Sequence, residues 1–270
     1  MILQTPVHIP HSTFEITPSD RILFVGSCFA DNIGRRFSDN LFNATVNPYG
    51  VMYNPASIKH TVSRIAITPP FATEGVDLAV FTLGTNHVYV LNETGEIVDN
   101  CQKRPQSLFT ERQLTIDECV AYLAETVDIL RAITPKTKIV LTVSPIRYAK
   151  YGFHGSMLSK ATLLLAANKL MLQYSDIAYF PAYEIMNDEL RDYRFYAPDM
   201  LHPSEQAIDY IFDRFRDTFF SKETAQFYEE WQPIKRALQH RPFNAESEEY
   251  QRFIRQVKAK EEEFKHKWNI

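Results

Sequence analysis

The sequence predicts an α/β fold in which helices cover both faces of a five-stranded, mainly parallel sheet. Three features of the pattern lead to this expectation. Short apolar runs of strand length recur along the chain, longer segments of helical period separate them, and clusters of turn-forming residues mark the junctions. An inserted β-hairpin and a C-terminal helical extension complete the expected architecture.

The expected strands are the apolar runs that end in turn-forming or polar residues. Their order along the chain, with helical segments between them, is the pattern of a sheet covered on both faces. They are Ile22–Gly26, Ala44–Val46, Leu78–Leu83, Lys138–Val143 and Ile177–Phe180.

The expected helices follow from apolar residues spaced three and four apart, which share one helix face. Between Ile116 and Ile133 these residues are Ile116, Val120, Leu123, Val127 and Leu130. The segment Leu158–Leu172 is so rich in leucine and alanine that its helix should be largely buried. A third stripe comprises Ile208, Ile211, Phe212, Phe215 and Phe219.

Two segments depart from this alternation. The stretch HVYVLNETGEIVDN alternates apolar and polar residues around a turn, which predicts a β-hairpin after the third strand. The charged segment Ala245–Trp268 places Phe253, Val257 and Phe264 on one helix face, which is expected to pack on the domain or on a second subunit. We therefore expect a main domain over residues 1–225 and a helical extension over residues 226–270, through which a homo-oligomer could form.

The composition of the chain limits the classes of protein to which it could belong. The 270 residues suffice for one sizeable domain and a small appendage, and the content of 45% hydrophobic and 23% charged residues is typical of globular proteins. A net charge of −4 without a basic, aromatic patch argues against a nucleic-acid partner. The sequence lacks a signal-peptide pattern and an apolar run long enough to span a membrane, so no membrane partner is expected. The three cysteines, an odd number without a CxxC motif, favour a reducing compartment, and the cytoplasm is the expected location.

The stretch RILFVGSCFADN ends the first expected strand on glycine, serine and cysteine. Gly26 allows a tight turn, and the helix expected from about Phe29 directs its free N–H groups and positive end toward that turn. Ser27 is therefore a candidate nucleophile whose oxyanion backbone N–H groups nearby could stabilise. A serine at this position is equally explained as the N-cap of the helix, so both interpretations remain open.

A second stretch, APDMLHPSEQ, places Asp199 and His202 three residues apart before a helix that Pro203 is expected to open. A neutral imidazole can take the proton of a serine hydroxyl, and a carboxylate can hold the other ring nitrogen. The alternative is that His202 caps the helix and Asp199 is an ordinary loop residue.

Further residues could bind substrate or an oxyanion. Gly50 in NPYGVMYNP offers a backbone N–H, and Asn86 in TLGTNHVY offers a side-chain amide, although both also suit ordinary turns. Cys28 would be an able nucleophile at a helix N-terminus, but a free cysteine is more often buried and inert. Lys103 and Arg147 could bind an acidic substrate group. The adjacent Ser159 and Lys160 are most simply interpreted as a helix cap.

With these stretches in view, the sequence resembles the GSCFA family within the SGNH or GDSL-like hydrolase superfamily. The string GSCFA stands at Gly26–Ala30. The other matching strings are NPYGVMYNP, FTLGT, NCQK, LTVSPI, SKATL, YFPAYEI and DMLHPS, which together reach from Arg21 to about Phe220. The resemblance does not extend to the last 50 or so residues.

The resemblance implies a flavodoxin-like three-layer α/β/α fold and ester hydrolysis. The nucleophile, oxyanion glycine, oxyanion asparagine and base of the superfamily fall on Ser27, Gly50, Asn86 and His202. Asp199 would complete the triad. This chain departs from the pattern at Cys28, where the GDSL string has aspartate, and at Gln102, where NCHK of the family has histidine.

The sequence thus predicts a serine esterase or O-acyl-ester hydrolase that needs no metal or organic cofactor. Its expected partner is a small ester, carbohydrate-linked or another metabolite. An acyltransferase using the same site and a non-catalytic binding or scaffold protein are the alternatives. Placement of Ser27 and His202 on opposite faces of the sheet would exclude the hydrolase.

Overall fold

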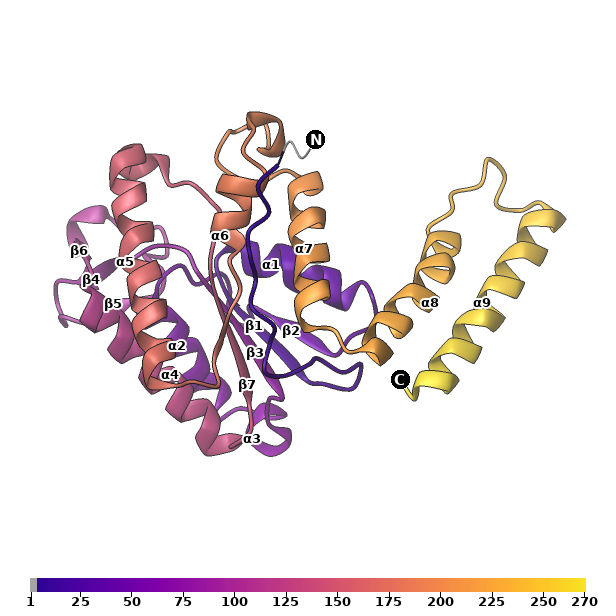
Figure 1. The fold of residues 1–270 in the computed structure, drawn as a ribbon, viewed down its shortest axis with the longest axis horizontal. Helices are drawn as coiled ribbons and strands as arrows, with labels where there is room; N and C mark the ends of the chain where they lie inside the picture. Colours follow the sequence, from indigo (N-terminus) through magenta and orange to yellow (C-terminus); the bar gives the residue numbers. More distant parts are fainter. Residues whose placement is uncertain (1–3) are drawn as a thin grey trace.

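The computed structural model, which describes residues 4–270, has a five-stranded parallel sheet between two layers of helices (Figure 1). The strand order is β2-β1-β3-β7-β8, so the chain starts near the centre, and every pairing within this sheet is parallel. The strands are β1 Ile22–Gly26, β2 Ala44–Val46, β3 Leu78–Leu83, β7 Lys138–Val143 and β8 Ala178–Tyr179. This confirms the expected three-layer α/β/α class.

Alternate residues of each central strand enter different cores. In β1, Ile22 and Phe24 face the core beneath the helices α1 (Cys28–Ser38) and α7 (Glu205–Phe219). Leu23 and Val25 face the core beneath α2 (Pro55–Ile65), α4 (Ile116–Ile133) and α5 (Gly152–Gln173). Because both faces are covered, the central strands are mostly apolar, which is why short apolar runs located them in the sequence.

Two expected helices match their apolar stripes, whereas the segment Leu158–Leu172, expected to be largely buried, exposes Leu158, Leu165 and Leu172 to solvent. The stripe residues of α4 and α7 are buried, apart from the partly buried Ile116. The helices are α1 Cys28–Ser38, α2 Pro55–Ile65, α3 Phe71–Glu74, α4 Ile116–Ile133, α5 Gly152–Gln173, α6 Ala182–Glu184, α7 Glu205–Phe219, α8 Lys222–Leu238 and α9 Glu248–Trp268. Four short turns of helix complete them, namely η1 Gln106–Leu108, η2 Ala149–Tyr151, η3 Ile185–Glu189 and η4 Tyr193–Phe195.

The expected hairpin is present and gains a third strand. The strands β4 His87–Leu91 and β5 Ile97–Val98 pair antiparallel, and β6 Phe109–Gln113 pairs with the other edge of β4. Four of the five residues of β6 are exposed, so its sequence carries no alternating apolar signal. This small sheet lies beside α2 and α4, away from α7 (Figure 1).

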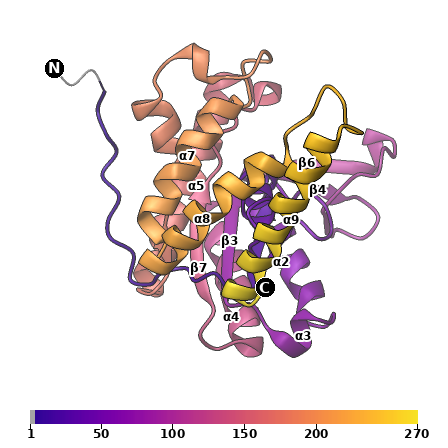
Figure 2. The same ribbon diagram turned by 90° about the vertical axis from the view of Figure 1, so that its right-hand side faces the viewer.

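The C-terminal helices α8 and α9 form a helical hairpin that projects from the side of the domain carrying α7 (Figures 1 and 2). Phe264 of α9 packs on Phe227 and Trp231 of α8, with ring centroids 5.1 and 5.3 Å apart. The apolar face of α9 is thus largely covered by α8. Helix α8 also spans the expected domain boundary at residue 225.

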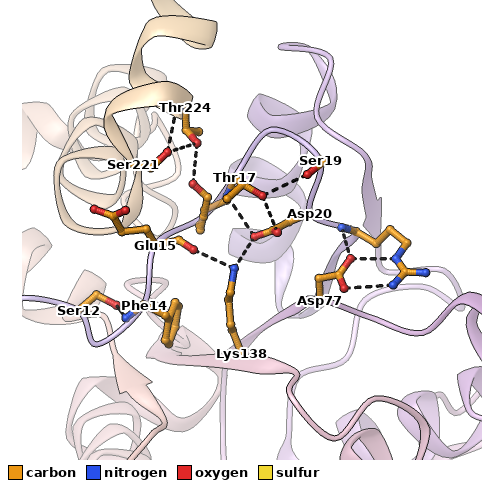
Figure 3. Close-up of polar contacts among 12 residues, drawn as sticks. Ser12, Phe14, Glu15, Thr17, Ser19, Asp20, Asp77, Lys138, Ser221 and Thr224 are labelled. Atoms are coloured by element: carbon orange, nitrogen blue, oxygen red, sulfur yellow. Dashed lines mark hydrogen bonds and ion pairs between the residues drawn. The ribbon is translucent and has the colours of Figure 1, made fainter. Parts of the chain in front are cut away.

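The N-terminal segment is held at the amino edge of the sheet, opposite the edge at which the strands end (Figure 3). Lys138 Nζ donates to the carbonyl oxygen of Glu15 and to Asp20, both at 2.8 Å. The hydroxyl of Thr224 in α8 donates to the carbonyl oxygen of Ile16 at 2.6 Å. The first segment therefore connects the sheet to the start of the helical extension. Over residues 4–270, no helix is long and apolar enough to cross a membrane.

Candidate active site

The turn after β1 is built around Gly26, whose φ of +150° lies outside the range that L-residues usually adopt. A Cβ atom at this position would overlap with the carbonyl oxygen and side chain of Thr82 on β3. The side chain of Asn47, after β2, accepts a hydrogen bond from the Gly26 N–H at 2.9 Å and donates to Asp31 of α1 at 2.6 Å. The sequence analysis did not single out Asn47, which fixes the turn from the neighbouring loop.

Ser27 is fully buried at the end of this turn. Its hydroxyl accepts a hydrogen bond from the N–H of Phe29 at 3.3 Å and shares another with the Thr82 hydroxyl at 3.2 Å. Ser27 is therefore the N-cap of α1, which confirms the interpretation of this serine as a helix cap. N-capping leaves its chemical role open, because the same turn places the hydroxyl at the carboxyl edge of the sheet.

Asp199 and His202 form a close pair on the loop before α7. Asp199 Oδ2 lies 2.6 Å from Nδ1 of His202, while its Oδ1 accepts the backbone N–H groups of Leu201 and His202 at 2.9 and 3.0 Å. These backbone hydrogen bonds, with the imidazole bond, lower the pKa of Asp199 to about 2. The carboxylate is thus positioned to hold one ring nitrogen and leave the other directed elsewhere.

The expected helix start at Pro203 is wrong by two residues. Ser204 is the N-cap, with its hydroxyl accepting the N–H of Ala207, and α7 begins at Glu205. Pro203 instead pairs with Tyr196 in an isolated β-bridge, so it belongs to the loop that carries His202.

Ser27 and the His202 loop lie at the same edge of the sheet. Arg147, which follows β7, donates its backbone N–H to the carbonyl oxygen of Leu201 at 3.0 Å and its Nη1 to that of Met200 at 3.0 Å. The loop thus rests on the carboxyl end of β7, two strands from the turn after β1. Among the described residues, the hydrogen bonds of Ser27 and of His202 go to other partners, and none joins the two side chains.

The two expected oxyanion donors already have partners. The N–H of Gly50 donates to the carbonyl oxygen of Asn47 at 2.8 Å, although the space around Gly50 is open. The buried side chain of Asn86 donates to the carbonyl oxygen of Leu114 at 2.8 Å. Their role at an oxyanion stays a prediction that requires a change of hydrogen bonding.

The structure places Cys28 and Lys103 in different surroundings. Cys28 is the first residue of α1 and half-buried against the core, and burial raises the pKa of its thiol. Lys103 lies exposed in the loop between β5 and η1 with φ of +57°. Cys28 therefore adjoins the Ser27 turn, whereas Lys103 lies in a loop that connects strands of the small antiparallel sheet.

Lys160 is the site residue that the sequence analysis interpreted wrongly. It lies inside α5 rather than at a helix cap, and its side chain is fully buried. Its Nζ donates to the carbonyl oxygens of Gly84 and Ser144, both at 2.7 Å, and burial lowers its pKa to about 7. A signal was present, because Lys160 shares the helix face of the buried Leu163 and Ala167, three and seven residues further on.

Lys160 lies close to the nucleophile turn through Gly84. A Cβ atom on Gly84 would lie 3.3 Å from the Cβ atom of Ser27 and 2.6 Å from the hydroxyl of Tyr148. That hydroxyl is buried without a hydrogen-bond partner among the described residues. Ser27, Lys160 and Tyr148 thus surround one glycine after β3.

A cavity of about 530 Å³ opens beside Lys160. Its walls come from the loop after β7, the first turns of α5 and the segment between α6 and η4. The residues that line it include Arg147, Phe153, Met157, Lys160, Tyr183, Met186, Arg191, Tyr193 and Tyr196. Since Arg147 also holds the His202 loop, the cavity adjoins the candidate base.

The parallel sheet and the Gly-Ser turn at the end of its first strand place the chain in the flavodoxin-like three-layer class. Within that class, the chain belongs to the GSCFA family, whose model matches residues 21–76 and 70–215. A model described as the GSCFA domain protein, C-terminal domain, matches residues 231–270, which include most of the helical extension.

Solved structures similar to this chain include esterases and a lipase. An acetylxylan esterase from Geobacillus stearothermophilus is 12% identical, with a TM-score of 0.49, over 77% of this chain and 98% of the esterase. A GDSL-like lipase from Bacteroides thetaiotaomicron is 15% identical, with a TM-score of 0.46, over 73% of this chain and 86% of the lipase. No curated protein matches this sequence at a significant level.

Proposed function

We propose that this protein is a serine hydrolase that cleaves a small ester, carbohydrate-linked or from another metabolite. The 2.6 Å hydrogen bond between Asp199 and His202, on a loop at the same sheet edge as Ser27, supports the proposal most strongly. In this mechanism Ser27 attacks the ester carbonyl, His202 takes the serine proton and returns it to the leaving alcohol, and Asp199 holds the imidazole.

The free N–H groups of α1 supply the electrostatic part of the mechanism. The backbone N–H of Cys28 lies at the positive end of the helix dipole, where a negative oxygen is stabilised. Lys160 adds a nearby cation when it is protonated. Attack requires the Ser27 hydroxyl to leave Thr82 and Phe29 and to come within hydrogen-bond reach of His202.

A second candidate is a binding protein that keeps the fold without turnover. The complete burial of the Ser27 hydroxyl and its N-cap bond favour this alternative. A third, acyl transfer to an acceptor other than water, would use the same three side chains and requires only that water be excluded.

Labelling with a fluorophosphonate, which reacts with activated serines, tests the hydrolase. Wild type, Ser27→Ala and Cys28→Ala would be compared at equal concentration, with circular dichroism as a check of folding. Loss of label in Ser27→Ala alone supports the proposal, and loss in Cys28→Ala alone moves the nucleophile by one residue. Absence of label in all three, together with absence of hydrolysis of p-nitrophenyl acetate, favours the binding protein.

A further inference from the structure

The cavity beside Lys160 is lined by three basic residues and two acidic ones. The basic residues are Lys160, Arg147 and Arg191, and within the described residues none of the three forms an ion pair with a carboxylate. Lys160 is the most informative of the three, because burial of an ammonium group without a paired negative charge costs free energy. Its two partners are neutral carbonyl oxygens, so in the protonated form one of its three N–H groups has no hydrogen bond there.

Two carboxylates, Asp188 and Asp192, also line the cavity, but both residues are exposed. Asp192 accepts the backbone N–H of Arg194 at 2.9 Å, and its other oxygen lies 3.6 Å from the guanidinium of the same residue. These two acids are therefore on the exposed side of the cavity, whereas Lys160 is the charged residue of the lining that is buried.

The guanidinium of Arg147 lies against two aromatic rings, and part of it has no hydrogen-bond partner among the described residues. Its guanidinium carbon lies 4.1 Å from the ring centroid of Phe153 and 5.3 Å from that of Tyr196. Only Nη1 has a hydrogen-bond partner in the described part of the chain, namely the carbonyl oxygen of Met200. A planar guanidinium that contacts two rings and keeps free donors suits recognition of a carboxylate or phosphate.

The size and walls of the cavity indicate what else the ligand contains. A volume of about 530 Å³ lies in the range of small-molecule sites and accommodates a ligand the size of one sugar unit or two. The rings of Tyr183, Tyr193 and Tyr196 provide flat apolar faces with polar edges, which suit a compact, hydroxylated molecule.

We propose that this cavity binds an anionic, sugar-sized molecule, whose carboxylate or phosphate group is held by Arg147 and Lys160. Anion binding in the cavity stands on the arrangement of charges alone. Its identification with the substrate rests on the proposed hydrolase function, and in that case the ester is an O-acylated sugar acid or sugar phosphate.

Equilibrium binding measured by isothermal titration calorimetry tests the proposal. The probes are D-glucuronate, D-glucose 6-phosphate and neutral D-glucose, none of which carries an acyl ester. We expect one or both anions to bind wild type at least about tenfold more tightly than glucose, since charge-assisted hydrogen bonds are about twice as strong as neutral ones. The preferred anion distinguishes a carboxylate from a phosphate substrate.

Arg147→Gln and Lys160→Met are each expected to weaken binding of the anion about tenfold or more, with binding of glucose little changed. Arg255→Gln, which replaces an exposed arginine of α9 far along the chain, is the matched control and should bind as wild type does. If Lys160→Met does not fold, Arg147→Gln alone decides the question.

Equal affinity for glucose and both anions, absence of binding by both anions, or unchanged anion affinity in Arg147→Gln would overturn the proposal. Because no probe is turned over, these outcomes are separate from fluorophosphonate labelling. If the protein is labelled but does not bind the anions, the anion-binding proposal is wrong and the hydrolase proposal stands. If it binds the anions but is not labelled, it is an anion-binding protein and the hydrolase proposal fails.

Discussion

The ammonium of Lys160 lies 2.7 Å from the carbonyl oxygen of Gly84, the residue that follows β3, and equally close to that of Ser144, which follows β7. One buried side chain from α5 thus joins the two loops beside the candidate nucleophile. The groups around it are the thiol of Cys28 and the rings of Tyr148 and Tyr183. Burial raises the pKa of each of these three groups, Cys28, Tyr148 and Tyr183.

Replacement of Lys160 by methionine should change how stability depends on pH. Burial lowers the pKa of this lysine to about 7 in the folded protein, against about 10.4 in the unfolded chain. The wild type therefore becomes more stable as the pH rises from 7, because the unfolded state then holds the extra proton.

We therefore compare the free energy of unfolding of Lys160→Met with that of wild type at each pH. The variant minus wild-type difference should be more positive at pH 6 than at pH 9, by on the order of 2 kcal/mol. Urea unfolding at the two pH values measures the difference. The control Lys169→Met removes an exposed lysine of the same helix and should leave the pH dependence of wild type. If the free energy of unfolding changes with pH equally in wild type and Lys160→Met, Lys160 keeps one charge state over this range.

Gly26→Ala should destabilise the protein by about 3 kcal/mol, because the new methyl group overlaps with the backbone of Thr82 in a tightly packed turn. Gly95→Ala is the matched control, since Gly95 also has a positive φ, of +72°, but has open space around it. Gly95→Ala should lower the free energy of unfolding by only about 1 kcal/mol, the cost of placing an alanine in this backbone conformation. Equal losses in urea unfolding would show that steric overlap at the turn is unimportant.

Much of the architecture could be predicted from the sequence because burial on both faces leaves an apolar run. The bounds of β1, β2, β3 and β7 match the expected ranges, and β8 lies within its own. The strand β6, with the sequence FTERQ, was missed for the converse reason, because most of its side chains face solvent.

The candidate site was predictable only in part. The Gly-Ser turn and the Asp199–His202 pair lie on short loops whose local sequence encodes them. The roles of Lys160 and Asn47 were not predicted, because they depend on partners far away in sequence, such as the carbonyl oxygen of Gly84 and the N–H of Gly26. Local periodicity indicates that a helix is buried, but it does not reveal which polar side chain finds a partner in the core.

Asp199→Asn should lower kcat for ester hydrolysis by about 10²-fold or more, because an amide cannot stabilise the imidazolium that forms as His202 takes the proton. With the pKa of Asp199 lowered to about 2, this carboxylate should stay ionised throughout an assay from pH 4 to 9. The pH profile of kcat in wild type should then show no inflection from Asp199 in that range.

The control for this variant is Asp176→Asn, which removes an exposed carboxylate paired with Arg131 on the surface. It should retain wild-type kcat. An Asp199→Asn enzyme as active as this control would exclude Asp199 from the reaction.

Phe264→Ala should loosen α9 from α8. The Phe264 side chain is buried between Phe227 and Trp231, and removal of a buried phenylalanine ring typically costs 3–5 kcal/mol, so a loss of about 3 kcal/mol is expected. Hydrogen exchange of the α9 amides should rise accordingly. Phe253→Ala, at a position with 36% exposure on the same helix, should change exchange far less, and similar changes in both variants would contradict this packing.

The contacts of Ile16 have a consequence for the order in which the protein is made. The carbonyl oxygen of Ile16 accepts a hydrogen bond from the hydroxyl of Thr224, 208 positions later, and the N–H of Ile16 donates to the carbonyl oxygen of Phe219. During translation, the N-terminal segment is released from the ribosome long before these partners exist. The parallel sheet can assemble while that segment is still unpaired, and its attachment must follow synthesis of the first turn of α8.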